Sequence, residues 1–264
     1  MASNKRSSSF NKQKEIEKKK KTKRKIRLTV FIVIVIITGI ISYLLNSPIF
    51  NIEDIEVVGN SQLDKQEIIE QSEIKLGKSI FTVSDVISKV RIKQNGYIED
   101  VKVIKKMPNI IKIEVKERTP EFQIRTENGI YIYIDEQGYI IDYSQELQDL
   151  VTITGMEITE ENIEKKKRLE DEDLNIKLEN ILHIKEEATN IGIYDKISEI
   201  QTRNEYILIL SSLNLTINLG NGTNIKDRMD YVKSIMEKEN GNSGTINVNG
   251  NLNEGFIPYF TESQ

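Results

Sequence analysis

The chain of 264 residues contains no cysteine and no tryptophan, and it has one histidine and four prolines. The absence of cysteine excludes a disulfide-stapled domain, a thiol enzyme and a cysteine-ligated zinc module. Because His183 is the single histidine, a metal triad or a serine relay would have to be built around one imidazole. We interpret His183 as a surface or partly packed residue of a helix.

The charge of the chain is divided unevenly. The net charge is −4, yet residues 1–27 hold 12 lysines and arginines against Glu15 and Glu17, so a basic tail precedes an acidic body. The basic tail carries no aromatic residue apart from Phe10, which disfavours a nucleic-acid arm that stacks on bases. We interpret the tail as a topology determinant that lies near anionic lipid.

A long uncharged run follows the basic tail. Residues 28–45 read LTVFIVIVIITGIISYLL, 18 residues that form a helix of nearly the length of a hydrocarbon core of about 30 Å. The run is long for a signal peptide and no small-residue cleavage step follows it, so we predict an uncleaved transmembrane helix at 28–46. Lysine and arginine stay on the cytoplasmic side, which predicts a cytoplasmic tail at 1–27 and an extracytoplasmic body.

The first part of the body predicts the order β-α-α-β-β. Residues 50–60 alternate as a strand and close on Gly59-Asn60, and Asp64 is positioned to cap a short helix. A second helix is expected after Thr82, its possible cap. Its apolar stripe consists of Val83, Val86, Ile87 and Val90. A hairpin around Met107-Pro108-Asn109 then presents one buried face, formed by Ile111, Ile113 and Val115.

The second part of the body predicts a mixed domain with a mainly antiparallel sheet. Residues 131–144, 150–155, 206–210, 213–220 and 245–249 show strand patterns, and residues 174–182 and 225–236 show helical apolar periodicity. The run GFIPYF at 255–260 is the most apolar part of the C-terminal segment. The predicted fold class is therefore α+β.

Several of these residues carry a resemblance to the FtsQ/DivIB family of bacterial cell-division proteins. The sequence is similar to the POTRA domain of that family at Val57, Gly59, Asn60, Gly77, Ile80, Phe81, Pro108, Ile111, Ile113, Val115, Glu117, Arg118 and Pro120. The second half resembles the β domain that follows it in the family, including Arg228-Met229 where lysine-leucine is usual. The resemblance implies a POTRA domain at 49–119, a β domain at 120–252 and a C-terminal tail at 253–264.

The resemblance also implies function and partners. Members of the family bind the bitopic division proteins FtsB (DivIC) and FtsL near the C-terminal end of the β domain and join them to septal cell-wall synthesis. By this resemblance we expect a non-enzymatic, single-pass scaffold of the divisome at the septum, embedded in cytoplasmic-membrane lipid. The expected partner-binding residues are Val248, Phe256 and Tyr259, with the alternative that they only close the core. A last strand at a sheet edge could accept a partner strand.

No motif in the sequence predicts catalysis, a cofactor or a metal. Ser72-x-x-Lys75 lacks the companion motifs of penicillin-binding enzymes, and Asp171, Asp173 and Asn175 lack the glycine and glutamate that complete a calcium loop. We therefore expect no small-molecule substrate and no nucleic-acid partner. Two alternatives stay open: a POTRA-containing translocation or envelope-assembly component, and a tethered cell-wall enzyme.

Overall fold

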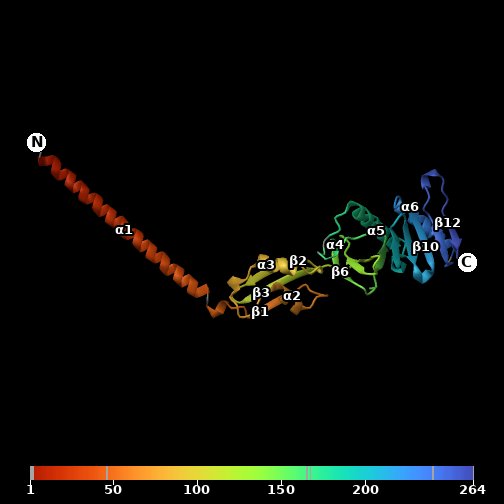
Figure 1. Cartoon of the computed structure of the whole chain (residues 1–264), viewed down its shortest axis with the longest axis horizontal. Coiled ribbons are helices and arrows are strands. Elements are labelled where there is room, and N and C mark those ends of the chain that lie inside the picture. The colour runs from red at the N-terminus through yellow and green to blue at the C-terminus, as the bar shows by residue number, and fades with distance from the viewer. Residues whose placement is uncertain (1–2, 46, 165, 167, 240, 264) are drawn as a thin grey trace.

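A long helix is followed by two separate sheets in the computed structural model, which describes residues 3–45, 47–164, 166, 168–239 and 241–263. Figure 1 shows helix α1 (Ser3–Leu45) at one end, the smaller sheet in the middle and the larger sheet at the other end. Within α1, residues Lys23–Tyr43 are apolar enough and long enough to cross a membrane, and the other described residues bury none of this span. The predicted α+β fold class is confirmed.

The middle part follows the predicted order of strands and helices. Its elements are the 3-10 turn η1 (Pro48–Phe50), strand β1 (Asp54–Val58), helix α2 (Lys65–Ser72), the 3-10 turn η2 (Ile80–Thr82), helix α3 (Asp85–Ile92), strand β2 (Ile98–Lys106) and strand β3 (Ile110–Glu117). The sheet order is β1-β3-β2, with β1 parallel and β2 antiparallel to β3. Ile111, Ile113 and Val115 face the core as their alternation predicts, because successive side chains of a strand point to opposite faces.

Helix α3 differs from the expectation drawn from its periodicity. The Ser84 side chain, and not Thr82, caps the helix by accepting a hydrogen bond from the backbone of Ile87. The buried residues of α3 are Ser88 and Ile92, and the predicted apolar stripe instead includes three exposed residues, Val86, Ile87 and Val90. The buried face of α3 is the one that carries the small Ser88 together with Ile92.

A corner at the far end of this part explains several of the motif residues. Gly59 has φ +88°, and a side chain there would overlap the carbonyl oxygen of Val115. Glu117 accepts hydrogen bonds from the backbone N–H groups of Ser61, Gln62 and Leu63 at 2.8 to 3.1 Å and from the Ser61 hydroxyl at 2.7 Å. Burial alone would raise the pKa of Glu117, but these donors hold the pKa below its ordinary value of 4.5.

We expect Glu117→Gln to destabilise this part of the protein by about 1–2 kcal/mol at neutral pH, because an uncharged amide replaces a carboxylate that accepts four hydrogen bonds. Because the folded pKa is lowered, the carboxylate stabilises the fold above pH 4.5, and this contribution is lost as pH falls through the folded pKa. The measurement is hydrogen exchange of the middle-part amides in the full chain at several pH values. The control is Glu114→Gln. The Glu114 carboxylate pairs with Lys112 on the outward face of the same strand, and its loss should lower the stability less.

The C-terminal part contains most of the sheet structure. Its strands are β4 (Phe122–Arg125), β5 (Tyr131–Ile134), β6 (Ile140–Ser144), β7 (Val151–Thr154), β8 (Glu199–Gln201), β9 (Tyr206–Leu210), β10 (Leu215–Gly220), β11 (Gly244–Asn247) and β12 (Tyr259–Glu262). Its helices are α4 (Glu160–Glu164), α5 (Glu172–Asn190) and α6 (Ile225–Glu239), with 3-10 turns η3 (Tyr194–Lys196), η4 (Ser211–Leu213) and η5 (Leu252–Glu254).

These strands form one nine-stranded sheet of order β12-β11-β10-β9-β8-β7-β4-β5-β6. Helices α5 and α6 contribute buried side chains to its core, among them Ile181, Ile184, Met229 and Val232. A second and separate cluster of buried side chains lies under the three-stranded sheet. The strand at 245–249 was expected to be the last of the chain, but β12 continues the sheet beyond it.

Candidate protein-docking edge

The nine-stranded sheet has two edges, and one of them is covered. At the β6 edge, Tyr139 forms an antiparallel bridge with Arg168, and the backbone N–H of Leu169 donates to Gly138 at 2.8 Å. Gly96 of the middle part lies so close that a side chain on it would overlap the carbonyl of Ile141. Backbone from two other segments therefore occupies the β6 edge.

The β12 edge is open in the part of the chain that the structure describes. Strand β12 pairs antiparallel with β11, and Ser263 N–H donates to Ser243 at 3.0 Å. Hydrogen-bonded pairs alternate along such a ladder, so the next bonded residues of β12 are Thr261 and Tyr259. The backbone N–H and C=O groups of Phe260 and Glu262 therefore point away from the sheet.

One edge of the smaller sheet, strand β2, differs from the β12 edge in composition. Strand β2 carries Lys102, Lys105 and Lys106 and a register shift between Ile98 and Asp100. Lysines and bulges on an edge strand are devices that oppose pairing with another chain. Strand β12 has the sequence YFTE, without lysine, and its register with β11 is regular.

An apolar group of side chains lies beside the open edge. The rings of Phe256 and Tyr259 are 6.2 Å apart at 59°, and a side chain on Gly250 would overlap the Phe256 ring. Ile257 is 80% exposed and Tyr259 51% exposed. We call Phe256, Ile257 and Tyr259 the edge cluster. The neighbouring Phe260 instead packs on the core, over Gly244.

The structure brings two of the three predicted partner-binding residues together and separates the third. Phe256 and Tyr259 belong to the edge cluster, whereas the side chain of Val248 is fully buried. The backbone N–H of Val248 donates to Asn218 at 3.0 Å. Its side chain fits the alternative stated for all three residues, that they close the core.

Arg228 of α6 holds the chain that leads to the edge cluster. Its side chain is 3% exposed, and it donates to the carbonyl of Thr223 at 2.7 Å and to the carbonyl of Val248. Burial lowers the pKa of the Arg228 guanidinium from its ordinary value. Sequence reasoning gave Arg228 no such role, although its place beside Met229 between the buried Ile225 and Val232 was a signal, because a buried arginine needs acceptors.

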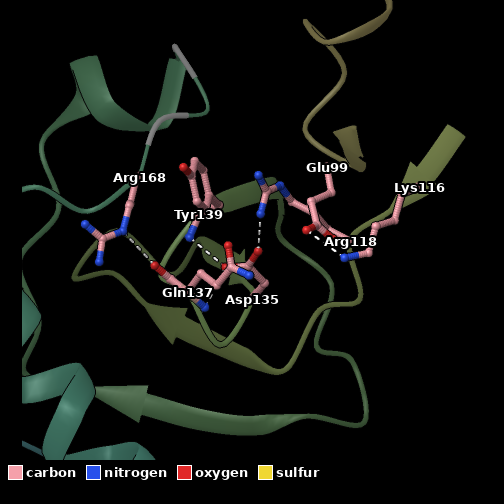
Figure 2. Close-up of polar contacts among 7 residues, drawn as sticks. All are labelled: Glu99, Lys116, Arg118, Asp135, Gln137, Tyr139 and Arg168. Atoms are coloured by element: carbon pink, nitrogen blue, oxygen red, sulfur yellow. Dashed lines mark hydrogen bonds and ion pairs between the residues drawn. The ribbon is translucent and has the colours of Figure 1, made fainter. Parts of the chain in front are cut away.

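A second group of polar residues joins the two sheets (Figure 2). Arg118, just after β3, pairs with Asp135 at 2.5 Å, and each side chain is 10% exposed. The Arg118 guanidinium also lies 3.7 Å from the centre of the Tyr139 ring. The other oxygen of Asp135 accepts from the backbone of Gln137 at 2.9 Å and of Tyr139 at 2.8 Å, which closes the β5–β6 turn.

This junction was not identified as a site from the sequence. Arg118 was noted only among the residues that carry the family resemblance, and Asp135 only as part of the strand pattern at 131–144. The sequence gives a local signal for an acidic residue that opens a turn. It gives no local signal that this residue pairs with an arginine 17 positions away. Arg168, which donates to Gln137 at 2.9 Å, supports the same turn from the segment after α4.

The motifs rejected for catalysis or metal binding have local contacts. Asp171 caps α5 by accepting from the backbone of Asp173 and Leu174. His183 lies on α5 with Glu187 at 3.8 Å, and its side chain is 47% exposed. Across the described residues, no group of three or more His, Asp or Glu is arranged to hold a metal ion.

Comparison with known proteins gives the same family as the sequence motifs. Residues 50–118 match the model of the FtsQ-type POTRA domain. The chain is 35% identical over 138 residues to the cell division protein DivIB of Clostridium botulinum strain Hall, covering 52% of this chain and 54% of the relative. It is 28% identical over 207 residues to DivIB of C. botulinum strain Loch Maree, covering 77% and 78%.

The match extends to proteins named FtsQ. The cell division protein FtsQ of Corynebacterium glutamicum is 29% identical over 102 residues, which cover 39% of this chain and 45% of the relative. The chain thus spans about half the length of several curated relatives that it matches. The fold is that of a POTRA domain followed by a second, mixed-sheet domain, and it is preceded by a helix that is long and apolar enough to cross a membrane. The chain is similar to bacterial cell-division proteins named DivIB and FtsQ, and its residues 50–118 match their POTRA domain. The apolar helix α1 fits a single-pass membrane protein.

Proposed function

We propose that this protein is a non-enzymatic scaffold of the bacterial divisome that links FtsB/DivIC-like and FtsL-like bitopic proteins and supports septal cell-wall synthesis. The names of its relatives support a role in cell division. The observation that carries the docking proposal is the difference between the two edges of the large sheet, since β6 is occupied by backbone and β12 presents unpaired groups. An exposed edge is a ready site for addition of a partner strand.

The proposed topology places residues 1–27 in the cytoplasm and the body outside it, at the division septum. The lysines and arginines before the span support this orientation, because basic residues stay on the cytoplasmic side. The POTRA domain at 49–119 then lies next to the membrane, and the β domain at 120–252 presents the docking edge with the segment 253–264.

In the proposed complex a partner strand adds to β12 through main-chain bonds. Phe260 and Glu262 supply the outward backbone donors and acceptors, as the ladder register requires. Pro258 has no N–H group, so pairing is expected to start after it. The edge cluster supplies apolar anchors beside this ladder, and a few such aromatic residues usually contribute most of the binding energy.

The test is to replace Phe256 and Tyr259 together with alanine in the full chain. We expect the affinity for the FtsB/DivIC-like partner to fall about tenfold or more, because anchors of this kind contribute at least about 1.4 kcal/mol. The measurement is titration of the partner onto nanodisc-embedded protein, accompanied by crosslinking in cells and mass spectrometry. Tyr143→Ala, an exposed tyrosine on β6 at the opposite edge, is the matched control.

A backbone substitution distinguishes strand addition from side-chain contact alone. Glu262→Pro removes an outward N–H and should weaken partner binding without weakening the pairing of β12 with β11. Thr261→Pro removes an N–H that points toward β11, so it should weaken both partner binding and the pairing of β12 with β11. If all these variants bind the partner like the parent protein while folded, the docking edge is disproved. Capture of secretion components in place of division proteins would favour the translocation alternative.

A further inference from the structure

One end of the POTRA domain faces the anchor, and its identity follows from the course of the chain. The parallel strands β1 and β3 run away from α1, whereas β2 runs back toward it. Three segments therefore meet at this end: residues 48–52, 73–84 and 105–110. Asn51 forms a bridge with Ser79, the N–H of Glu53 donates to Asn109 at 2.9 Å, and the ammonium group of Lys105 donates to Val83 at 2.6 Å.

This anchor-proximal end carries large apolar side chains that no other part of the described protein covers. Ile49 is 59% exposed, Leu76 60%, Phe81 41% and Met107 53%. They come from all three segments, and the Phe81 ring lies 5.1 Å from the ring of Phe50 beside Ile49. Single exposed apolar residues are ordinary on a soluble surface, but several gathered at one end indicate an interaction site.

The same end lies within reach of the membrane. The Ser79 hydroxyl donates to the carbonyl of Leu45, the last residue of α1, at 3.3 Å. Leu45 is two residues beyond the apolar span, which ends at Tyr43, and two helical residues rise about 3 Å. The headgroup layer on each side of the hydrocarbon core is about 5–8 Å thick. The anchor-proximal end therefore starts inside that layer.

Basic side chains accompany the apolar ones. Lys75 and Lys78 are exposed in the segment that carries Leu76, and no ion pair of either is found among the described residues. Glu73 in the same segment is paired with Arg91 at 3.0 Å, while Glu53 remains exposed on the neighbouring segment. Apolar side chains flanked by lysine match the boundary between acyl chains and anionic headgroups.

From this continuity with the anchor we propose that the anchor-proximal end of the POTRA domain inserts into the outer interfacial layer of the bilayer that holds α1. Ile49, Leu76, Phe81 and Met107 enter the boundary of the acyl chains, and Lys75 and Lys78 meet lipid phosphates. The contact fixes the tilt of the body on the membrane. The inference rests on the membrane span and is independent of the proposed partner docking.

The test uses the absence of cysteine from the chain. Single cysteines at Leu76 or Met107 of the full protein are labelled with a fluorophore in vesicles of phosphatidylethanolamine and phosphatidylglycerol that contain headgroup-level nitroxide lipid. The matched control is a cysteine at Val90, which is 59% exposed on the same domain. Val90 is six residues beyond Ser84, the cap of α3, and a helix rises about 1.5 Å per residue, so Val90 lies about 9 Å farther from the anchor-proximal end.

We expect nitroxide lipid to quench the labels at Leu76 and Met107 several-fold more than the label at Val90. Equal quenching at the three positions would overturn the proposal. In a second comparison the label is at position 49, and Leu76 and Met107 are both changed to glutamate. This double substitution should abolish most of the quenching of the label. The same label should keep its quenching in Val90→Glu. Retention of quenching in the double variant would also overturn the proposal, whatever the variants do to partner binding.

Discussion

Replacing Asp135 with alanine is expected to lower the free energy of unfolding of the body by about 3–5 kcal/mol, the cost of leaving a buried charge without its partner. The Arg118 guanidinium, with a side chain 10% exposed, would lose the carboxylate 2.5 Å away. The β5–β6 turn would also lose the two backbone donors that Asp135 accepts. The measurement is urea denaturation of the full chain in nanodiscs, monitored by hydrogen exchange of both sheets.

The neighbouring ion pair shown in Figure 2 is a matched control for this result. Lys116 and Glu99 are 2.8 Å apart, but the Lys116 side chain is 68% exposed. Solvent-exposed pairs contribute at most about 1 kcal/mol, so Glu99→Ala should have a small effect. Arg118→Met combined with Asp135→Ala should recover part of the loss, because the unpaired buried charge is removed. An Asp135→Ala loss no larger than that of Glu99→Ala would contradict the proposed role of the pair.

The second large effect is expected from Arg228→Met. Methionine keeps much of the apolar stem but leaves the carbonyls of Val248 and Thr223 without their donor, at a cost of about 2–4 kcal/mol. Because Val248 follows β11, faster hydrogen exchange should appear first in β11 and β12. Partner affinity should fall with it, since β12 would be ordered for less of the time.

The control for this substitution lies two residues earlier on the same helix. Lys226 is exposed, so Lys226→Met changes charge and side-chain type without removing a buried donor. It should leave exchange in β11 and β12 unchanged. If Arg228→Met exchanges like Lys226→Met, then Arg228 does not hold this segment.

The POTRA part was predictable wherever a local pattern decided the structure. Strict alternation identified Ile111, Ile113 and Val115 as buried, and Asp64 caps α2 as expected by accepting from the backbone of Gln66 at 2.6 Å. The orientation of helix α3 was harder to predict. Its apolar periodicity shows that the helix has an apolar face but does not show whether that face packs on the sheet. The face that meets the sheet is instead the one that carries Ser88 and Ile92.

The candidate site was only partly predictable for the same physical reason. The apolar composition of residues 255–260 indicated the segment, and the family resemblance indicated Phe256 and Tyr259 within it. The burial of Val248, the register of β12 and the bond from Arg228 all depend on contacts between distant segments. Strand β12 has four residues and follows a loop with its own 3-10 turn, so no alternation was long enough to identify it.

The strand order of the large sheet also determines how the protein would carry mechanical load. The chain enters the sheet from the anchor at β4, whereas β12 is the outermost strand on one side. A pull on β12 during constriction would therefore pass across β11, β10, β9, β8 and β7 before it reached β4 and the membrane. Strand β12 itself is held by four residue pairs to β11. Because β12 has a single partner strand in the described sheet, any such load enters the fold through these four pairs.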